Sequence, residues 1–249
     1  MFGSYWSVTK YKDIMHVETN HQLYSSEARL GGITIRDIPP EFRRRSFISS
    51  DPPYHDDQRK VVSPVVAPMN LQRMSEQIRE RTQRVLDGLP RNEKFDWVQR
   101  VSVELTTMML ATLFDYPIDQ KAKLIRWSDT FICDINAPDA PVRSEEERFA
   151  EQMRFAEHMN EIWEERAKKP KSFDVISIMA HGEATNKMTL RQRMGILILF
   201  LVGGNDTTRN SMTGGLLGLS RFPEQFHKLR ENPELVTSAV SESCAGRRR

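Results

Sequence analysis

The sequence predicts a mostly α-helical protein with a short β element near its N-terminus. Apolar residues recur at helical spacing through most of the 249 residues, in roughly eight or nine separate segments. Prolines stand mainly between these segments, where chain turns are expected. The segment at residues 4–9 is rich in the aromatic and β-branched residues typical of strands, and no repeat of fixed period is present.

The first forty or so positions predict a strand, a helix and a loop, in that order. Residues 4–9 (SYWSVT) favour the strand, and residues 12–18 favour a helix whose apolar residues share one face. Residues 30–40 place paired glycines and paired prolines around an Ile-Thr-Ile run. This arrangement predicts a loop that contains a short extended piece.

A series of helices is expected from about residue 54 onward. Asp51 is expected to cap the first of them, with Pro52 and Pro53 in the first turn, and Pro64 is expected to stop or kink it. Amphipathic patterns predict further helices at residues 71–86, 95–114, 121–131, 144–167, 175–180, 190–219 and 223–229.

Composition excludes several classes of protein. Hydrophobic residues make up 39% and charged residues 28% of the chain, which fits a globular protein with a sizeable core and excludes collagen, coiled-coil rods and wholly disordered chains. The 36 Lys and Arg nearly balance the 34 Asp and Glu, for a formal net charge of +2. Such a balance gives no reason to expect nucleic acid or an anionic membrane surface as a partner.

The cysteines and the apolar runs indicate a cytoplasmic protein. Two cysteines, Cys133 and Cys244, are too few for a disulfide framework or a structural zinc site, which favours a reducing compartment. The longest uncharged run, residues 194–205, has the length of a buried core helix. It falls short of the roughly 18 to 20 apolar residues of a transmembrane segment.

The most unusual segment is residues 202–210 (VGGNDTTRN), within the most apolar predicted helix. Two adjacent glycines inside a helix cost about 1 kcal/mol each relative to alanine. They let a large flat group approach the backbone, and a threonine hydroxyl can replace a backbone bond and widen the helix into a groove. Asp206 is then placed to relay protons. The alternative is a helix–helix crossing that needs small residues, with Asp206 facing solvent.

A second segment, residues 51–59 (DPPYHDDQR), offers two cationic donors. His55 and Arg59 are four residues apart and therefore share a helix face. Such a pair suits a carboxylate or a phosphate. The alternative is that Arg59 pairs with surface acids and that His55 is a solvated helix residue.

Together the two segments resemble the signatures of the cytochrome P450 family. Residues 203–208 (GGNDTT) are similar to the family's I-helix signature, [AG]-G-x-[DE]-T-[TS], at every defined position, and residues 51–59 resemble its C-helix signature, Asp-Pro-Pro-x-His-x-x-x-Arg. Residues 5–14 resemble the early strand and helix of bacterial members, and residues 31–35 the B–C loop of the alkane-hydroxylase branch. The resemblance covers residues 1–240 and implies a partial cytochrome P450 fold, about its B to J helices.

The resemblance also implies how this chain would meet haem, the family's cofactor. His55 and Arg59 would hold the haem propionates. Gly203 and Gly204 would let haem and bound oxygen lie against the central helix.

Two further roles follow from the same resemblance. Asp206 and Thr207 would form the acid–alcohol pair that delivers protons during oxygen activation. On weaker grounds, the substrate pocket would be lined by Ile33, Thr34, Ile35 and Leu199.

The sequence departs from the family at its C-terminal side. Glu242 is not followed three residues later by arginine, so the Glu-x-x-Arg of the K helix is absent, as is the cysteine loop that ligates iron. Neither Cys133 nor Cys244 is expected to replace that ligand, so no metal-ligating residue is predicted. Residues 241–249 are expected to form an aberrant basic tail that cuts off a helix. These departures predict a chain truncated before the K helix and the cysteine loop, although a natural tail is the alternative.

Two functional interpretations remain at this point. In the first, the parent protein is a haem-thiolate monooxygenase that hydroxylates a small apolar substrate, such as a medium-chain alkane or fatty chain. It would use dioxygen and two electrons from a ferredoxin and its reductase, and the present chain would be inactive alone. In the second, the chain is a helical apolar-ligand-binding or regulatory protein without a redox role, which leaves the joint occurrence of the two signatures unexplained.

Overall fold

A computed structural model describes residues 5–34 and 38–245. Its α-helices confirm the predicted helical class and most predicted positions. Their bounds are α1 Tyr11–Thr19, α2 Tyr54–Val62, α3 Pro68–Asp87, α4 Glu104–Phe114, α5 Lys121–Ile132, α6 Glu145–Ala167, α7 Val175–His181, α8 Leu190–Val202, α9 Thr208–Arg221, α10 Pro223–Glu231 and α11 Val236–Ala245.

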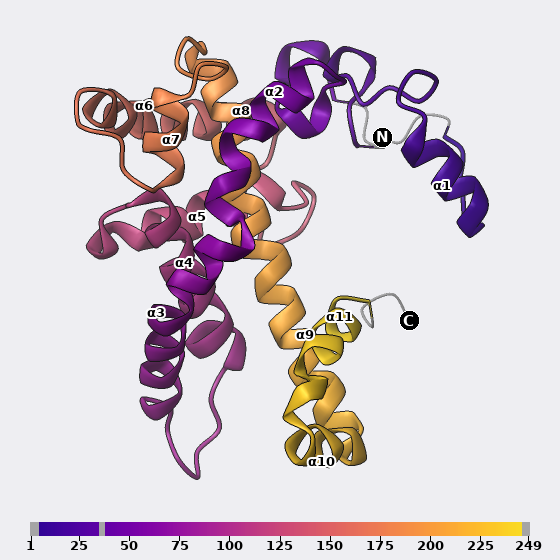
Figure 1. Cartoon of the computed structure of the whole chain (residues 1–249), viewed down its shortest axis with the longest axis vertical. Helices are drawn as coiled ribbons and strands as arrows, with labels where there is room; N and C mark the ends of the chain where they lie inside the picture. The colour runs from indigo at the N-terminus through magenta and orange to yellow at the C-terminus, as the bar shows by residue number, and fades with distance from the viewer. Residues whose placement is uncertain (1–4, 35–37, 246–249) are drawn as a thin grey trace.

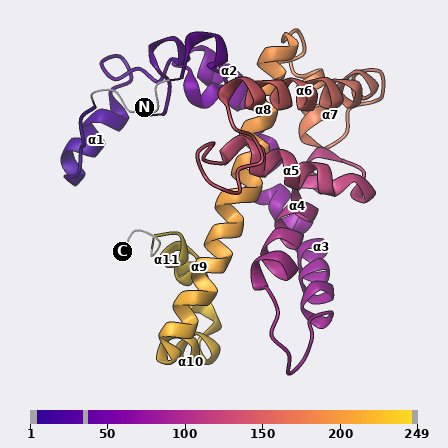
Figure 2. The same cartoon turned by 180° about the vertical axis from the view of Figure 1, so that it is seen from behind.

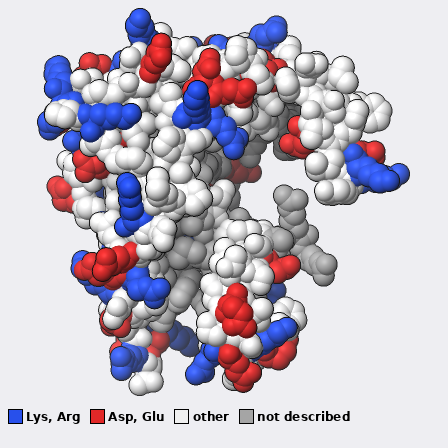
Figure 3. Space-filling view, viewed as in Figure 1, with Lys and Arg blue, Asp and Glu red and all other residues white. Residues whose placement is uncertain are grey.

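The helices are arranged around one long central rod formed by α8 and α9 (Figure 1). Helices α3 to α7 gather on one side of this rod, and α10 and α11 pack against its lower end. Helix α1 extends away from the upper part of the molecule, as the view from behind also shows (Figure 2). Between α1 and the lobe of α9 to α11 the surface is deeply hollowed (Figure 3).

Local side-chain bonds explain where several helices begin. The Ser144 hydroxyl, the Asp174 carboxylate and the Thr189 hydroxyl each accept a backbone N–H in the first turn of α6, α7 and α8. Asp51 does not act in this way, so the predicted cap of α2 is wrong. The Asp51 carboxylate instead accepts bonds from the Ser25 hydroxyl and the Ser26 N–H, because the loop before α2 folds back against it.

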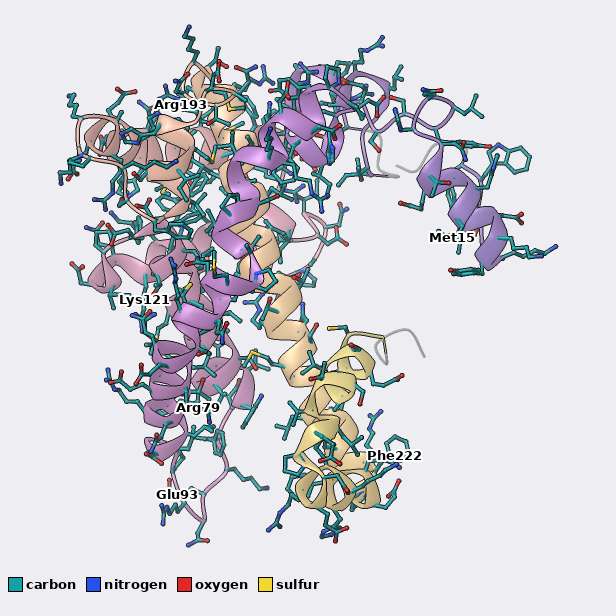
Figure 4. All side chains as sticks on the ribbon, viewed as in Figure 1. Met15, Arg79, Glu93, Lys121, Arg193 and Phe222 are labelled. Atoms are coloured by element: carbon teal, nitrogen blue, oxygen red, sulfur yellow. The ribbon has the colours of Figure 1, made fainter. Side chains whose placement is uncertain are left out.

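The core lies where α4 to α8 meet. Figure 4 labels Arg193 of α8 at one edge of it, where its guanidinium donates to the Asn160 side chain at 2.6 Å and to Glu164 at 2.8 Å. The same guanidinium lies 4.4 Å from the centre of the Trp163 ring, so a single charged side chain ties α8 to α6. The largest fully buried side chains are Trp163, Phe114, Phe155, Leu110, Leu124, Met159, Ile176, Met179, Met194, Ile196, Leu197 and Leu201.

The predicted β element is wrong for the residues that the structure describes. Residues 5–9 form no regular secondary structure, and the Trp6 side chain is 95% exposed. A strand requires a neighbouring strand to pair its backbone groups, and no described segment supplies one. The loop around residues 31–32 is confirmed, since Gly31 and Gly32 both have positive φ, at 120° and 71°.

Two predicted helices differ in detail from the structure. The helix expected over residues 95–114 starts with a π-helical turn at Val98–Val103 before α4 begins. Helix α11 runs on to Ala245, across the position where the tail was expected to cut it off, because the intervening residues all tolerate helical geometry. Within the part of the chain that is described, no helix is long and apolar enough to cross a membrane.

Candidate functional site

The central rod is interrupted by a π-helical turn at Gly203–Thr207, called here the π segment. The Thr207 hydroxyl donates a hydrogen bond to the Gly203 carbonyl at 2.6 Å. Because this side chain bonds one turn back along the helix, the backbone can widen locally without leaving a carbonyl unpaired. The widening predicted from the sequence is therefore confirmed.

The two glycines of the π segment have different surroundings. A Cβ on Gly203 would meet nothing within 4 Å, whereas a Cβ on Gly204 would lie 3.2 Å from the Leu110 side chain of α4. Gly204 thus serves the close crossing of two helices, which was the alternative interpretation. Gly203 is exposed and leaves the backbone open to an approaching group.

Asn205 fixes the π segment to α4. Its side chain is fully buried, and its Oδ1 accepts a hydrogen bond from the Thr106 hydroxyl at 2.7 Å. Its Nδ2 has no partner. The sequence did not assign this role. The threonine pair at residues 106–107, polar within an apolar helix, was the available signal.

Asp206 belongs to a chain of charges that the sequence also did not predict. Its Oδ1 accepts bonds from Asn210 at 2.9 Å and from Arg209 at 3.1 Å. The other end of Arg209 donates to Asp129 of α5 at 3.0 Å. The Asp206 side chain is 24% exposed, and Thr207 beside it is exposed. The acid is held in place, and the alcohol faces the open surface.

The predicted propionate pair lies on α2. His55 is half-buried, and its Nδ1 lies 2.7 Å from an Asp56 carboxylate oxygen. Arg59 is exposed, and its guanidinium has no partner among the residues that the structure describes. Arg59 does not pair with a surface acid, so that part of the alternative interpretation is not met.

Helix α2 lies against the first half of the rod. The Gln192 amide of α8 donates to the Tyr54 hydroxyl of α2 at 3.4 Å, and α2 packs against α7. Figures 1 and 2 both place α2 beside α8. No hydrogen bond or ion pair joins His55 or Arg59 to the π segment in the described part of the chain, so the structure brings together the helices rather than these side chains.

The predicted substrate-wall residues lie in two places. Ile33 is 60% exposed in the loop after α1, next to Thr34, and Ile35 lies outside the described residues. Leu199 is half-buried on α8, one turn before the π segment. Their proposed shared role stays a prediction.

The structure gives neither cysteine the surroundings of a metal ligand. Cys133 follows α5, and its sulfur lies 3.6 Å from the guanidinium of Arg148. Cys244 is exposed on α11, with its sulfur 3.7 Å from the Ser211 hydroxyl. Within the described ranges, no three His, Cys, Asp or Glu residues are grouped so that they could hold a metal ion.

Comparisons with known proteins agree on one family. No protein-family model matches the chain. Linalool 8-monooxygenase of Pseudomonas putida is 32% identical over 250 residues, which cover 96% of this chain and 61% of that protein. Steroid C26-monooxygenase of Mycolicibacterium smegmatis is 26% identical, over 95% of this chain and 56% of that protein.

Solved structures give the same answer for the fold. Cytochrome P450-153 from Novosphingobium aromaticivorans superposes with a TM-score of 0.85 at 39% identity, over 97% of this chain and 60% of that one. CYP153D17 from Sphingomonas sp. PAMC 26605 gives 0.84 at 41% identity, over 97% and 60%. The chain therefore spans about 60% of the length of these relatives. Over that span, its sequence and its helical fold are similar to those of cytochrome P450s.

Proposed function

We propose that this chain forms the distal side of the haem pocket in a haem-thiolate monooxygenase. The observation that carries the proposal is the uncovered π segment. There, an exposed threonine hydroxyl and a fixed carboxylate stand beside a glycine with open space in front of its backbone. If the glycines served only a tight helix crossing, a neighbouring helix would cover both of them, but no atom covers Gly203.

The residues present fit part of what haem requires. Arg59 offers an unpaired, exposed guanidinium for a propionate carboxylate. His55 leaves its Nε2 free of any hydrogen bond in the described structure. Gly203 supplies room for a flat group. The iron ligand does not fit, because neither cysteine is placed as a thiolate donor, so we propose that residues 1–249 do not hydroxylate by themselves.

Haem, when bound with a thiolate ligand, would supply the oxidising chemistry. The role of this chain is to hold the cofactor and to manage protons. Thr207 holds a proton on Oγ1, which now donates to the Gly203 carbonyl and can turn toward the open face. Asp206, the preceding residue, would take up a proton from solvent and pass it on to this hydroxyl, since its side chain is 24% exposed. Arg209 and Asn210 position the carboxylate from the other side.

We further propose a small, largely hydrocarbon substrate, such as a medium-chain alkane or fatty chain. Two relatives carry names that describe oxygenation of linalool and of a steroid, and both molecules consist mainly of hydrocarbon. Leu199 and the exposed Ile33 offer apolar surface for such a molecule. A ferredoxin and its reductase would supply the electrons.

Haemin titration of the purified chain tests the proposal. Arg59→Gln is expected to weaken haemin binding about tenfold, the usual loss for a charge-assisted bond. Arg73→Gln, at an exposed arginine of α3 that also lacks a side-chain partner, is the matched control and should leave binding unchanged. Equal affinities in both variants would show that haem is held elsewhere or not at all.

The carbon monoxide difference spectrum of the reduced, haem-loaded chain tests whether a cysteine thiolate binds the iron. A Soret band typical of haem without a thiolate ligand is expected. A normal thiolate-type band would mean that Cys133 or Cys244 reaches the iron, which contradicts the proposal.

A further inference from the structure

A small cavity away from the π segment lies between the loop before α2 and the first turns of α6. Its volume is about 30 Å³, and its polar lining comes from Arg44, Glu145, Arg148 and Gln152. The rings of Phe42 and Phe149, whose centres are 5.5 Å apart, form its apolar wall. Two cations and one anion therefore share a confined space.

Arg148 is a buried cation with one donor left over. Its Nη1 binds Glu145 at 2.6 Å, and its Nη2 donates to the Cys133 carbonyl at 2.6 Å. Its Nε is fully buried and has no partner. The side chain is only 7% exposed. A buried donor without a partner costs about 1–3 kcal/mol, so an acceptor in the cavity would be favourable.

Arg44 brings a second positive charge to the same place. It is half-buried, and its guanidinium has no hydrogen bond or ion pair in the described part of the chain. Burial and then the charge of Arg148 lower the pKa of Arg44, while Glu145 acts in the opposite direction. Gln152 is 3% exposed, lines the cavity, and its amide is likewise without a partner in the described structure.

The charges in this cavity do not balance. Glu145 compensates one guanidinium, and the other stands beside it with apolar rings nearby, where charge–charge energies are larger than in water. A second negative charge would relieve the repulsion and accept the unused donors. Protein interiors normally pair such charges.

Size narrows the choice of anion. A site for one water needs about 10–15 Å³, so 30 Å³ holds a group the size of one or two waters. Phosphate esters and nucleotides do not fit. Chloride and the carboxylate of formate do.

We propose that this cavity binds one small monovalent anion, a halide or a carboxylate group, between Arg44 and Arg148. The Arg148 Nε, the Arg44 guanidinium and the Gln152 amide supply the donors. The bound ion joins the loop before α2 to the N-terminal turns of α6. Its effect is on the stability of that junction and is separate from the proposed haem site.

Chloride NMR line width on the purified chain tests the proposal directly. Saturable broadening is expected, and formate should remove it by competition if both anions use the site. Arg44→Met should weaken the binding about tenfold or more, because a charge-assisted partner is lost. Arg44 makes no side-chain hydrogen bond, so this variant is expected to fold. Arg154→Met removes an exposed arginine of α6, the helix that carries Arg148, and should leave the broadening unchanged.

Thermal unfolding gives an independent measurement. The unfolding temperature of the unsubstituted chain should be higher in chloride than in gluconate at the same ionic strength, as for any ligand that binds only the folded state. Arg44→Met should reduce this difference, because its affinity for chloride is lower. Equal unfolding temperatures in chloride and gluconate would show that the cavity holds water only and would overturn the proposal. Equal chloride line broadening in the unsubstituted chain and in Arg44→Met would do the same.

Discussion

The Thr106 hydroxyl of α4 and the Asn205 amide oxygen of the π segment are joined by a fully buried hydrogen bond of 2.7 Å. This bond links a helix of the core to the part of the rod that carries Asp206 and Thr207. It explains how the π segment is held in register, while the face with Gly203 stays open.

Thr106→Val should therefore destabilise the protein. The substitution keeps the side-chain shape and leaves the Asn205 oxygen without a donor, so the free energy of unfolding should fall by about 1–3 kcal/mol. Urea denaturation measures the change. Thr107→Val is the matched control, since the Thr107 hydroxyl is buried without a partner and its removal should be neutral or stabilising. If the free energy of unfolding falls equally in the two variants, the bond between Thr106 and Asn205 does not contribute to stability.

The two glycines should respond differently to alanine. Gly203→Ala should raise the free energy of unfolding by about 0.5–1 kcal/mol, because the added methyl group meets no atom and restricts the unfolded chain. Gly204→Ala should gain less or lose stability, since Leu110 must move. Haemin titration should show weaker binding for Gly203→Ala. If Gly203→Ala binds haemin as tightly as the parent, no flat group approaches the backbone at this point.

Arg209→Gln should cost more stability than removal of an exposed pair. The Arg209 side chain is 14% exposed and bonds both Asp129 and Asp206, so a loss of about 1–2 kcal/mol is expected. Arg84→Gln removes a pair with Glu80 in which both side chains are mostly exposed, and its effect should stay under about 0.5 kcal/mol. Urea denaturation at low and at high salt measures both losses. The loss of unfolding free energy in Arg209→Gln should remain at high salt, because salt screens partly buried charges only weakly.

His158 should make the protein less stable in mild acid. Burial, and then the charge of Lys123, lowers the pKa of this half-buried residue. The Tyr116 hydroxyl lies 2.9 Å from its Nε2. The unfolded chain then takes up the proton first, so stability should fall as the pH drops through about 6.5 and level off below the lowered pKa.

Urea denaturation between neutral pH and mild acid measures this slope. His158→Gln should flatten it, and His227→Gln, at an exposed histidine of α10, should not. A slope that is the same in both variants would assign the pH dependence to other groups.

The periodic pattern predicted most helices, and the residue types of the π segment predicted its widening. Both are local properties. A threonine hydroxyl that bonds back to Gly203 needs only its own turn of helix. The amphipathic spacing of residues 71–86 likewise identifies α3 whatever lies around it.

Partners distant in the chain were decided by the tertiary structure alone. Asp51 was expected to cap α2 but bonds Ser25 and Ser26, and residues 5–9 find no strand to pair with among the described residues. The sequence by itself thus determined the helices and the chemistry available at the π segment. Only folding decided that Gly204 meets Leu110 while Gly203 stays open, because the spacing of residues along one helix does not state which neighbour covers each face.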